Sequence, residues 1–251
     1  MASTQLSTER SALAIVAVLF ASLLTGVQGA IAAALSLRSY LLVTPLPKSS
    51  RSLTLRFADI GLDHSWNIDS LPWNAFTESG KKRYSPDSLK RLDPRLMKAM
   101  KPFVASIQEG VLQTAATSFL YLFLMIGSPF SPPAVYALRS TIPIGAGLGS
   151  SASIAVCLSA ALQIQNFTLT MPFKGMMPHE TQLQLDRVNN WAFVGEMCIH
   201  GNPSGVDNTV ATGGKAVFFK RGDSSLPPDV THLKEYDSPP VPGLHVLLSC
   251  C

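Results

Sequence analysis

Several features that would assign this chain to a common protein class are missing from its sequence. The four cysteines (Cys157, Cys198, Cys250 and Cys251) show no Cys-x-x-Cys spacing, and a reduced intracellular protein fits them best. The five histidines are scattered, so we do not expect a zinc site. Charged residues make up only 14% of the chain, and the net charge of +4 is diffuse. The basic clusters at residues 81–83 and 90–91 lack interleaved aromatic residues. They predict a solvated loop and no nucleic-acid partner.

Charge is also absent from residues 11–37, between Arg10 and Arg38. This run is long enough to span a bilayer, and residues 11–29 also look like a secretory signal peptide. The alternative is a buried strand–turn–strand, with the turn at residues 26–29 and the second strand over residues 30–43. Composition alone favours a membrane segment, whereas the family resemblance described below favours the strands.

The 251 residues suffice for one large domain with a sizeable core. Residues 62–93 are polar and contain Pro72, Gly80 and Pro86, which predicts a long surface insertion. Residues 104–126 are strongly apolar and predict a core helix, with a second membrane span as the alternative. The other predicted elements are strands at residues 53–57, 135–141 and 215–220, a helix at residues 153–162, and a helix at residues 185–200 that ends at Gly201.

A glycine-rich loop occupies residues 142–152, with the sequence Ile-Pro-Ile-Gly-Ala-Gly-Leu-Gly-Ser-Ser-Ala. Glycines allow successive backbone N–H groups to turn toward one bound anion, and the helix that follows adds the positive end of its dipole. No Gly-Lys-Ser/Thr follows, and the third glycine comes one residue too early for Gly-x-Gly-x-x-Gly. The pattern predicts a phosphate cradle, with a plain turn before a buried helix as the alternative.

Two acidic residues lie downstream of this loop. Glu196 falls in an otherwise apolar helix, where a buried carboxylate is costly unless it is paired or binds a metal. Asp207 follows a turn in which Asn202 can cap a new helix and Pro203 can begin it. As isolated acids they would be a solvated helix-face residue and a capping residue. Together with a phosphate cradle they match phosphoryl transfer, which needs oxygen ligands for Mg²⁺ and a carboxylate for the attacking hydroxyl.

At these residues the chain resembles the small-molecule kinase superfamily that includes galactokinase, homoserine kinase, mevalonate kinase and phosphomevalonate kinase. The loop at residues 143–152 resembles the ATP-binding motif common to many members. Residues 195–208, Gly-Glu-Met-Cys-Ile-His-Gly-Asn-Pro-Ser-Gly-Val-Asp-Asn, resemble the mevalonate kinases more specifically. The similarity runs from about Val27 to Phe219, and it includes residues 32–38 as an early strand.

The resemblance implies an α+β fold with a nucleotide-binding domain of the ribosomal S5 domain 2-like type. A C-terminal ferredoxin-like domain is expected to be absent from this chain. We expect an atypical apolar segment over residues 1–26, the ATP-binding domain over residues 27–223, and a linker with the truncated start of the second domain over residues 224–251.

The resemblance also implies ATP-dependent phosphorylation of mevalonate in isoprenoid and sterol precursor synthesis. Asp207 would act on the substrate hydroxyl, and Ser151 and Glu196 would bind Mg²⁺. The residues implied to hold the ATP phosphates are Ser140, Gly145, Ala146, Gly147, Leu148, Gly149, Ser150 and Ser151. A cytoplasmic protein is expected, with a membrane-anchored or secreted protein through residues 11–29 as the alternative, and a homodimer remains open.

Two departures from the family pattern affect this interpretation. Family members begin with a Pro-Gly-Lys segment whose lysine is a catalytic partner, and residues 1–26 contain no lysine. The C-terminal half of the family is also missing, which predicts a truncated or alternatively spliced product or an incorrect gene model, with impaired activity. The alternatives are a non-catalytic nucleotide-binding remnant and another kinase of the superfamily, such as phosphomevalonate kinase, which residues 200–205 argue against.

Overall fold

The computed structural model describes residues 10–22, 29–75, 91–170, 177–220, 229–232 and 245–249. Three predictions therefore lie outside the described residues: the turn at residues 26–28, the part of the insertion at residues 76–90, and most of the tail after residue 220.

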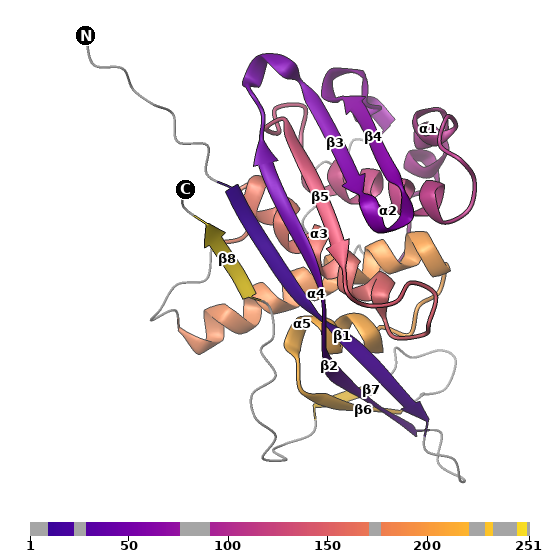
Figure 1. The fold of residues 1–251 in the computed structure, drawn as a ribbon, viewed down its shortest axis with the longest axis vertical. Helices are drawn as coiled ribbons and strands as arrows, with labels where there is room; N and C mark the ends of the chain where they lie inside the picture. Colours follow the sequence, from indigo (N-terminus) through magenta and orange to yellow (C-terminus); the bar gives the residue numbers. More distant parts are fainter. Residues whose placement is uncertain are drawn as a thin grey trace.

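The described strands form one mixed sheet (Figure 1). Along its main path the order is β4-β3-β5-β2-β1-β8, and β6 pairs with both β2 and β7. Strands β3 and β5 are parallel and the other pairs are antiparallel. The bounds are β1 (Arg10–Ser22), β2 (Gly29–Pro45), β3 (Ser52–Phe57), β4 (Leu62–Asn67), β5 (Ala134–Ser140), β6 (Ala216–Lys220), β7 (Asp229–His232) and β8 (His245–Ser249). Together with the helices they make the α+β fold that was predicted.

The uncharged N-terminal run forms two strands. β1 pairs with β2 in an antiparallel register from Ser11↔Val43 to Ser22↔Ala30. Of the two alternatives, the structure shows the pair of strands, and the turn between them lies outside the described residues. Among the described residues no helix is both long and apolar enough to cross a bilayer.

Helices cover one face of the sheet. Strand β5 shows why, because Ala134, Tyr136 and Leu138 are buried while the alternate residues are more exposed, as the two-residue period of a strand dictates. Helices α3 and α5 contact β1 and β2, and α2 and α4 pack on α3 (Figure 1). The helices are α1 (Pro94–Val104), α2 (Val111–Ile126), α3 (Ser150–Gln165), α4 (Pro178–His200) and α5 (Val206–Gly213).

The predicted single helix over residues 104–126 was wrong at its start. Helix α1 ends at Val104 and α2 begins only at Val111. Gly110 lies between them with a φ of 94°, a conformation that favours glycine and interrupts a helix. From Val111 on, α2 is the predicted core helix, because most of its side chains are buried.

The predicted surface insertion at residues 62–93 was wrong over its first half. Residues 62–67 form strand β4, and short 3-10 turns follow at residues 68–70 and 73–75. Leu62, Trp66, Ile68 and Leu71 are buried in the main core. Trp66 donates its indole N–H to the Phe103 carbonyl oxygen at 2.8 Å. Only a few apolar side chains anchor this segment to the core, but they are large. Because most of the other residues are polar, the composition of the segment did not indicate that it is buried.

The elements next to the glycine loop were predicted correctly, although some begin earlier or later than expected. α3 starts at Ser150 rather than Ser153, and α4 starts at Pro178 rather than Leu185. α4 ends where Gly201 has a φ of 73°, as predicted. The prediction that Asn202 and Pro203 begin the next helix was wrong, because α5 starts at Val206 with Gly205 as its N-cap.

Candidate functional site

The glycine loop connects the end of β5 to the start of α3. Gly145, Gly147 and Gly149 have φ values of 77°, 71° and 68°, and the residues between them do not have positive φ. Alternation of the sign of φ turns successive backbone N–H groups toward the same side, which creates an anion-binding concavity. A Cβ added at Gly145 or at Gly147 would meet no atom within 4 Å. The loop is therefore shaped by backbone geometry and leaves open space beside it.

Ser140 fixes the start of this loop. Its hydroxyl accepts the Ile142 N–H at 3.1 Å and lies 3.1 Å from the Ser39 hydroxyl. Its own N–H donates to the Asp59 carboxylate at 2.8 Å. These contacts tie the loop to the sheet.

Two helix N-termini open onto one pocket beside the loop. The pocket has a volume of about 650 Å³ and is lined by Gly110 and Val111 from α2 and by residues 149–151 from α3. Both helices have a glycine N-cap with no side-chain cap. The positive ends of the two helix dipoles therefore favour an anionic ligand in this pocket.

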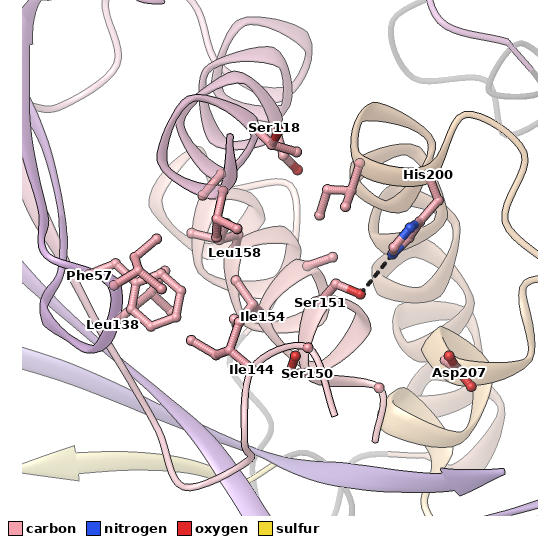
Figure 2. A pocket seen from close by; sticks show the side chains of 18 of the residues that line it. Phe57, Ser118, Leu138, Ile144, Ser150, Ser151, Ile154, Leu158, His200 and Asp207 are labelled. Atoms are coloured by element: carbon pink, nitrogen blue, oxygen red, sulfur yellow. Dashed lines mark hydrogen bonds between the residues drawn. The ribbon is translucent and has the colours of Figure 1, made fainter. Parts of the chain in front are cut away.

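The pocket has a polar and an apolar side (Figure 2). Ser150, Ser151, His200 and Asp207 supply its polar side chains near the loop, and the Ser118 hydroxyl also borders it. The opposite side is apolar and is drawn from strands as well as helices: Leu55, Phe57, Ile60, Leu138, Ile144, Ile154 and Leu158. An amphipathic cavity of this size suits a ligand that combines charged groups with an apolar or aromatic part.

Glu196 lies just behind the polar side. It is only 3% exposed, and its Oε1 has no hydrogen-bond partner. The Ser151 hydroxyl donates to its Oε2 at 3.3 Å. Burial raises the pKa of Glu196 to about 7, an effect that the Ser151 hydrogen bond reduces and the nearby Asp207 charge increases. A buried carboxylate with a free oxygen is costly in an empty site and suited to a cation.

Asp207 and His200 complete the polar side. Asp207 lies in the first turn of α5 and lines the pocket. Burial raises its pKa, and the neighbouring His200 lowers it in part. His200 is the last residue of α4, with its Nε2 at 3.1 Å from the Ser151 hydroxyl and 3.8 Å from Glu196 Oε2.

A hard divalent cation fits these residues. The described residues hold no group of three or more His, Cys, Asp or Glu placed to bind a metal ion alone. A cation beside Ser151 and Glu196 would therefore need further oxygen ligands from phosphate or water. Mg²⁺ binds in this way, through one or two carboxylates together with substrate phosphates.

Close helix packing sets the position of Glu196. The preceding residue, Gly195, would place an added Cβ 3.2 Å from Ala155 Cβ and 3.2 Å from Leu122 Cδ1. Its carbonyl accepts the buried Ser118 hydroxyl at 3.1 Å. A side chain at this position would require these neighbours to move by a few tenths of an ångström, so glycine favours the close approach of α4 to α2 and α3.

The structure brings most of the predicted site residues together. Gly145, Gly147, Leu148, Gly149, Ser150, Ser151 and Asp207 line the pocket, and Glu196 contacts Ser151 from behind. Ala146 and Ser140 do not line it, and Ser140 contributes through the loop contacts described above.

Sequence reasoning missed two parts of the site. His200 was within the motif but was assigned no role, although its spacing of four residues from Glu196 places both on one helix face. The apolar side was missed because its residues come from β3, the 3-10 turn at residues 58–60, β5, the glycine loop and α3, and no local pattern connects them.

Comparison with known proteins identifies the domain. Residues 112–215, which include the loop, Glu196 and Asp207, match the family model for the GHMP kinases N terminal domain. These residues are a GHMP kinase N-terminal domain. Across 85% of its length the chain is also 54% identical to the mevalonate kinase of Aspergillus fumigatus. It covers 41% of that protein, and it spans about half the length of other mevalonate kinases that it matches.

Solved structures share this fold at low sequence identity. A putative sugar kinase from Campylobacter jejuni has a TM-score of 0.58 at 12% identity, over 91% of this chain and 57% of that one. The mevalonate kinase of Methanococcus jannaschii has a TM-score of 0.55 at 17% identity, over 92% of this chain and 57% of that one.

Proposed function

We propose that this chain provides the ATP-binding part of a kinase that transfers the γ-phosphoryl group of ATP to the primary hydroxyl of mevalonate. The observation that carries the proposal is the convergence of three features on one pocket. These are the glycine loop with its alternating φ, the buried carboxylate of Glu196, and Asp207 at the start of α5. The identity of 54% to a mevalonate kinase selects the acceptor.

The loop amides and the N-terminus of α3 would bind the nucleotide phosphates. Such donors are fixed before the ligand arrives, so they stabilise developing charge without reorganising. Gly145, Gly147, Leu148, Gly149, Ser150 and Ser151 would supply this cradle, with Ala146 in the loop and Ser140 holding its start. The apolar side of the pocket would exclude water from the bound phosphates.

Ser151 and Glu196 would hold Mg²⁺. The free Oε1 of Glu196 is the group in the described structure that most needs a cation. When bound, Mg²⁺ would neutralise charge on the β- and γ-phosphate oxygens. Ser151 and Glu196 themselves come from α3 and α4, whose close packing at Gly195 fixes their separation.

Asp207 would orient the mevalonate hydroxyl and accept its proton. A general base works best when its pKa approaches the working pH, and burial moves the pKa of Asp207 upward. Its place in the first turn of α5 keeps the carboxylate at a fixed edge of the pocket. Cytoplasmic location and a place in sterol precursor synthesis are parts of the same proposal.

Two assays test the proposal. Calorimetry would measure binding of Mg²⁺ with AMPPNP, a non-hydrolysable ATP analogue, to the 251-residue chain. Mevalonate-dependent ADP formation would be measured in the chain and in a chimaera. The chimaera replaces residues 1–26 with the corresponding N-terminal segment of the Aspergillus fumigatus relative, and residues 224–251 with the sequence of that relative from the corresponding position to its end. We expect nucleotide binding in both proteins, and turnover in the chimaera that falls by orders of magnitude in Asp207→Asn.

Asp186→Asn serves as the matched control, because Asp186 is an exposed acid on α4 outside the pocket. Its turnover should be unchanged. An Asp207→Asn chimaera with normal turnover would remove Asp207 as the base. Preference for galactose, homoserine or phosphomevalonate over mevalonate would replace the proposed acceptor. Nucleotide binding without any turnover in the chimaera would favour a non-catalytic domain.

A further inference from the structure

The Ser151 hydroxyl lies between two polar groups from the end of α4. Glu196 Oε2 is 3.3 Å from Ser151 Oγ. His200 Nε2 is 3.1 Å from the same atom, the contact drawn as a dashed line in Figure 2. In the part of the chain that the structure describes, these two groups are the hydrogen-bond partners of Ser151 Oγ. Glu196 and His200 are four residues apart, one helical turn.

A hydroxyl carries a single proton and two acceptor lone pairs. When its oxygen binds a cation, the proton must point away from that cation. The Ser151 hydroxyl donates that proton to Glu196 Oε2, and Glu196 Oε1 stays buried and unpartnered, free to face the cation. His200 Nε2 lies at hydrogen-bond distance from Ser151 Oγ, and at 3.8 Å it is too far from Glu196 Oε2 for a hydrogen bond between them.

We propose that His200 positions Ser151 for cation binding through the hydrogen bond between its Nε2 and the Ser151 hydroxyl oxygen. His200 does not bind the cation itself, but it holds the Ser151 oxygen beside Glu196 with a lone pair free for the cation. This inference rests on the proposed function, since it needs a cation held by Ser151 and Glu196.

The end of α4 holds His200 in place for this role. Gly201 turns the chain with a φ of 73°, and its N–H donates to the Met197 carbonyl oxygen at 2.9 Å. The imidazole is 53% exposed, so its substitution should leave the fold intact. Groups that hydrogen-bond to metal ligands commonly change metal affinity by about 10–100-fold when removed.

Binding of Mn²⁺ to the chain–AMPPNP complex tests the proposal, measured by electron paramagnetic resonance of free Mn²⁺. His200→Leu has a side chain of similar size that cannot form this hydrogen bond, and we expect it to weaken Mn²⁺ binding about tenfold. His200→Gln places an amide group near the position of Nε2, and it should restore affinity to near that of the unsubstituted chain. Affinity for AMPPNP in EDTA should be the same in all variants.

The controls separate this proposal from the one on which it rests. His179→Leu changes an exposed histidine at the other end of α4 and should leave Mn²⁺ affinity unchanged. Glu196→Gln should abolish Mn²⁺ binding. If the unsubstituted chain binds no Mn²⁺, or Glu196→Gln binds it normally, the cation site itself is wrong and this inference falls with it. If Glu196→Gln loses the ion while His200→Leu keeps it, or if His200→Gln is as weak as His200→Leu, only the role of His200 is refuted.

Discussion

Replacing Glu196 with glutamine should stabilise the ligand-free protein at alkaline pH. The side chain is 3% exposed and one of its oxygens has no partner, so its negative charge is held in a poorly solvated position. Glutamine has nearly the same shape and no charge. The expected gain in stability therefore measures how much the buried charge of Glu196 destabilises the ligand-free protein.

The magnitude follows from the pKa of Glu196, raised from 4.5 to about 7. A shift of one pKa unit corresponds to about 1.4 kcal/mol, so the charged form costs about 3 kcal/mol. The folded state holds the proton more tightly than the unfolded state. The contribution of protonated Glu196 to stability is therefore fully present below pH 4.5. The free energy of unfolding falls as the pH rises from 4.5 to 7. Above pH 7 the whole cost is present.

Glutamine does not recover all of this amount. Its amide needs partners in a place where Oε1 has none, and an unsatisfied buried polar group costs about 1–3 kcal/mol. We expect Glu196→Gln to be about 1–2 kcal/mol more stable than the unsubstituted protein at pH 8. This corresponds to a rise in melting temperature of about 2–8 °C. At pH 4.5 the gain should be absent or reversed.

Urea unfolding between pH 4.5 and pH 8, followed by tryptophan fluorescence and circular dichroism, measures the difference. Glu180→Gln is the control, because Glu180 is an exposed acid in the first turn of the same helix. It should change stability by less than about 0.5 kcal/mol at either pH. A difference between the Glu196→Gln and unsubstituted proteins that does not change with pH would refute the reasoning. Added Mg²⁺ and AMPPNP should reverse the order of stability, because a ligand stabilises the protein that binds it.

Three further predictions concern glycine geometry and packing. Gly147→Val should weaken AMPPNP binding at least tenfold in calorimetry, because a β-branched side chain strains a φ of 71° and fills the open space beside the loop. Gly61→Val, with a similar φ of 74° outside the pocket, should bind normally, and equal loss in both would rule out the cradle. Gly195→Val should lower the free energy of unfolding in urea by about 1–3 kcal/mol and weaken Mn²⁺ binding, because its side chain forces α4 away from Ala155 and Leu122. Unchanged stability would contradict the close packing described for Gly195. Phe167→Gly should raise stability by about 0.5–1 kcal/mol, since this 93% exposed residue has a φ of 56° at the end of α3. A loss of stability in that variant would show that the phenyl ring has a partner in solution.

The sequence was most informative where one local pattern determined the structure. Three alternating glycines predicted the loop, and the apolar context of Glu196 predicted a buried carboxylate. Both predictions depend on residues that are close in sequence. The break at Gly110 was missed because an apolar run looks the same whether it is one helix or a loop and a helix.

The other parts could not be predicted because they depend on contacts between distant segments. Trp66 is buried because β4 pairs with β3, its indole N–H reaches the Phe103 carbonyl of α1 and its ring lies beside Phe119 of α2, and none of these contacts is visible in a polar sequence. The hydrogen bond between Ser151 and His200 joins residues 49 positions apart. The motif supplied both side chains, but only the packing of α3 on α4 brings them together.

Strand β2 has a consequence for the order in which the chain folds. Its Ser39 pairs with Ser140, and its Gly29 pairs with Lys220. Contacts between residues so far apart in sequence slow folding, because long loops must close before they form. At about 5–20 residues per second of synthesis, β2 waits roughly 10–40 s on the ribosome for its last partner. During this time the edge of residues 29–33 that pairs with β6 is open to other chains, whereas β1 can already cover the opposite edge. Pulsed hydrogen exchange on stalled nascent chains should show that the amides of residues 29–33 that donate to β6 become protected only after β6 has been made.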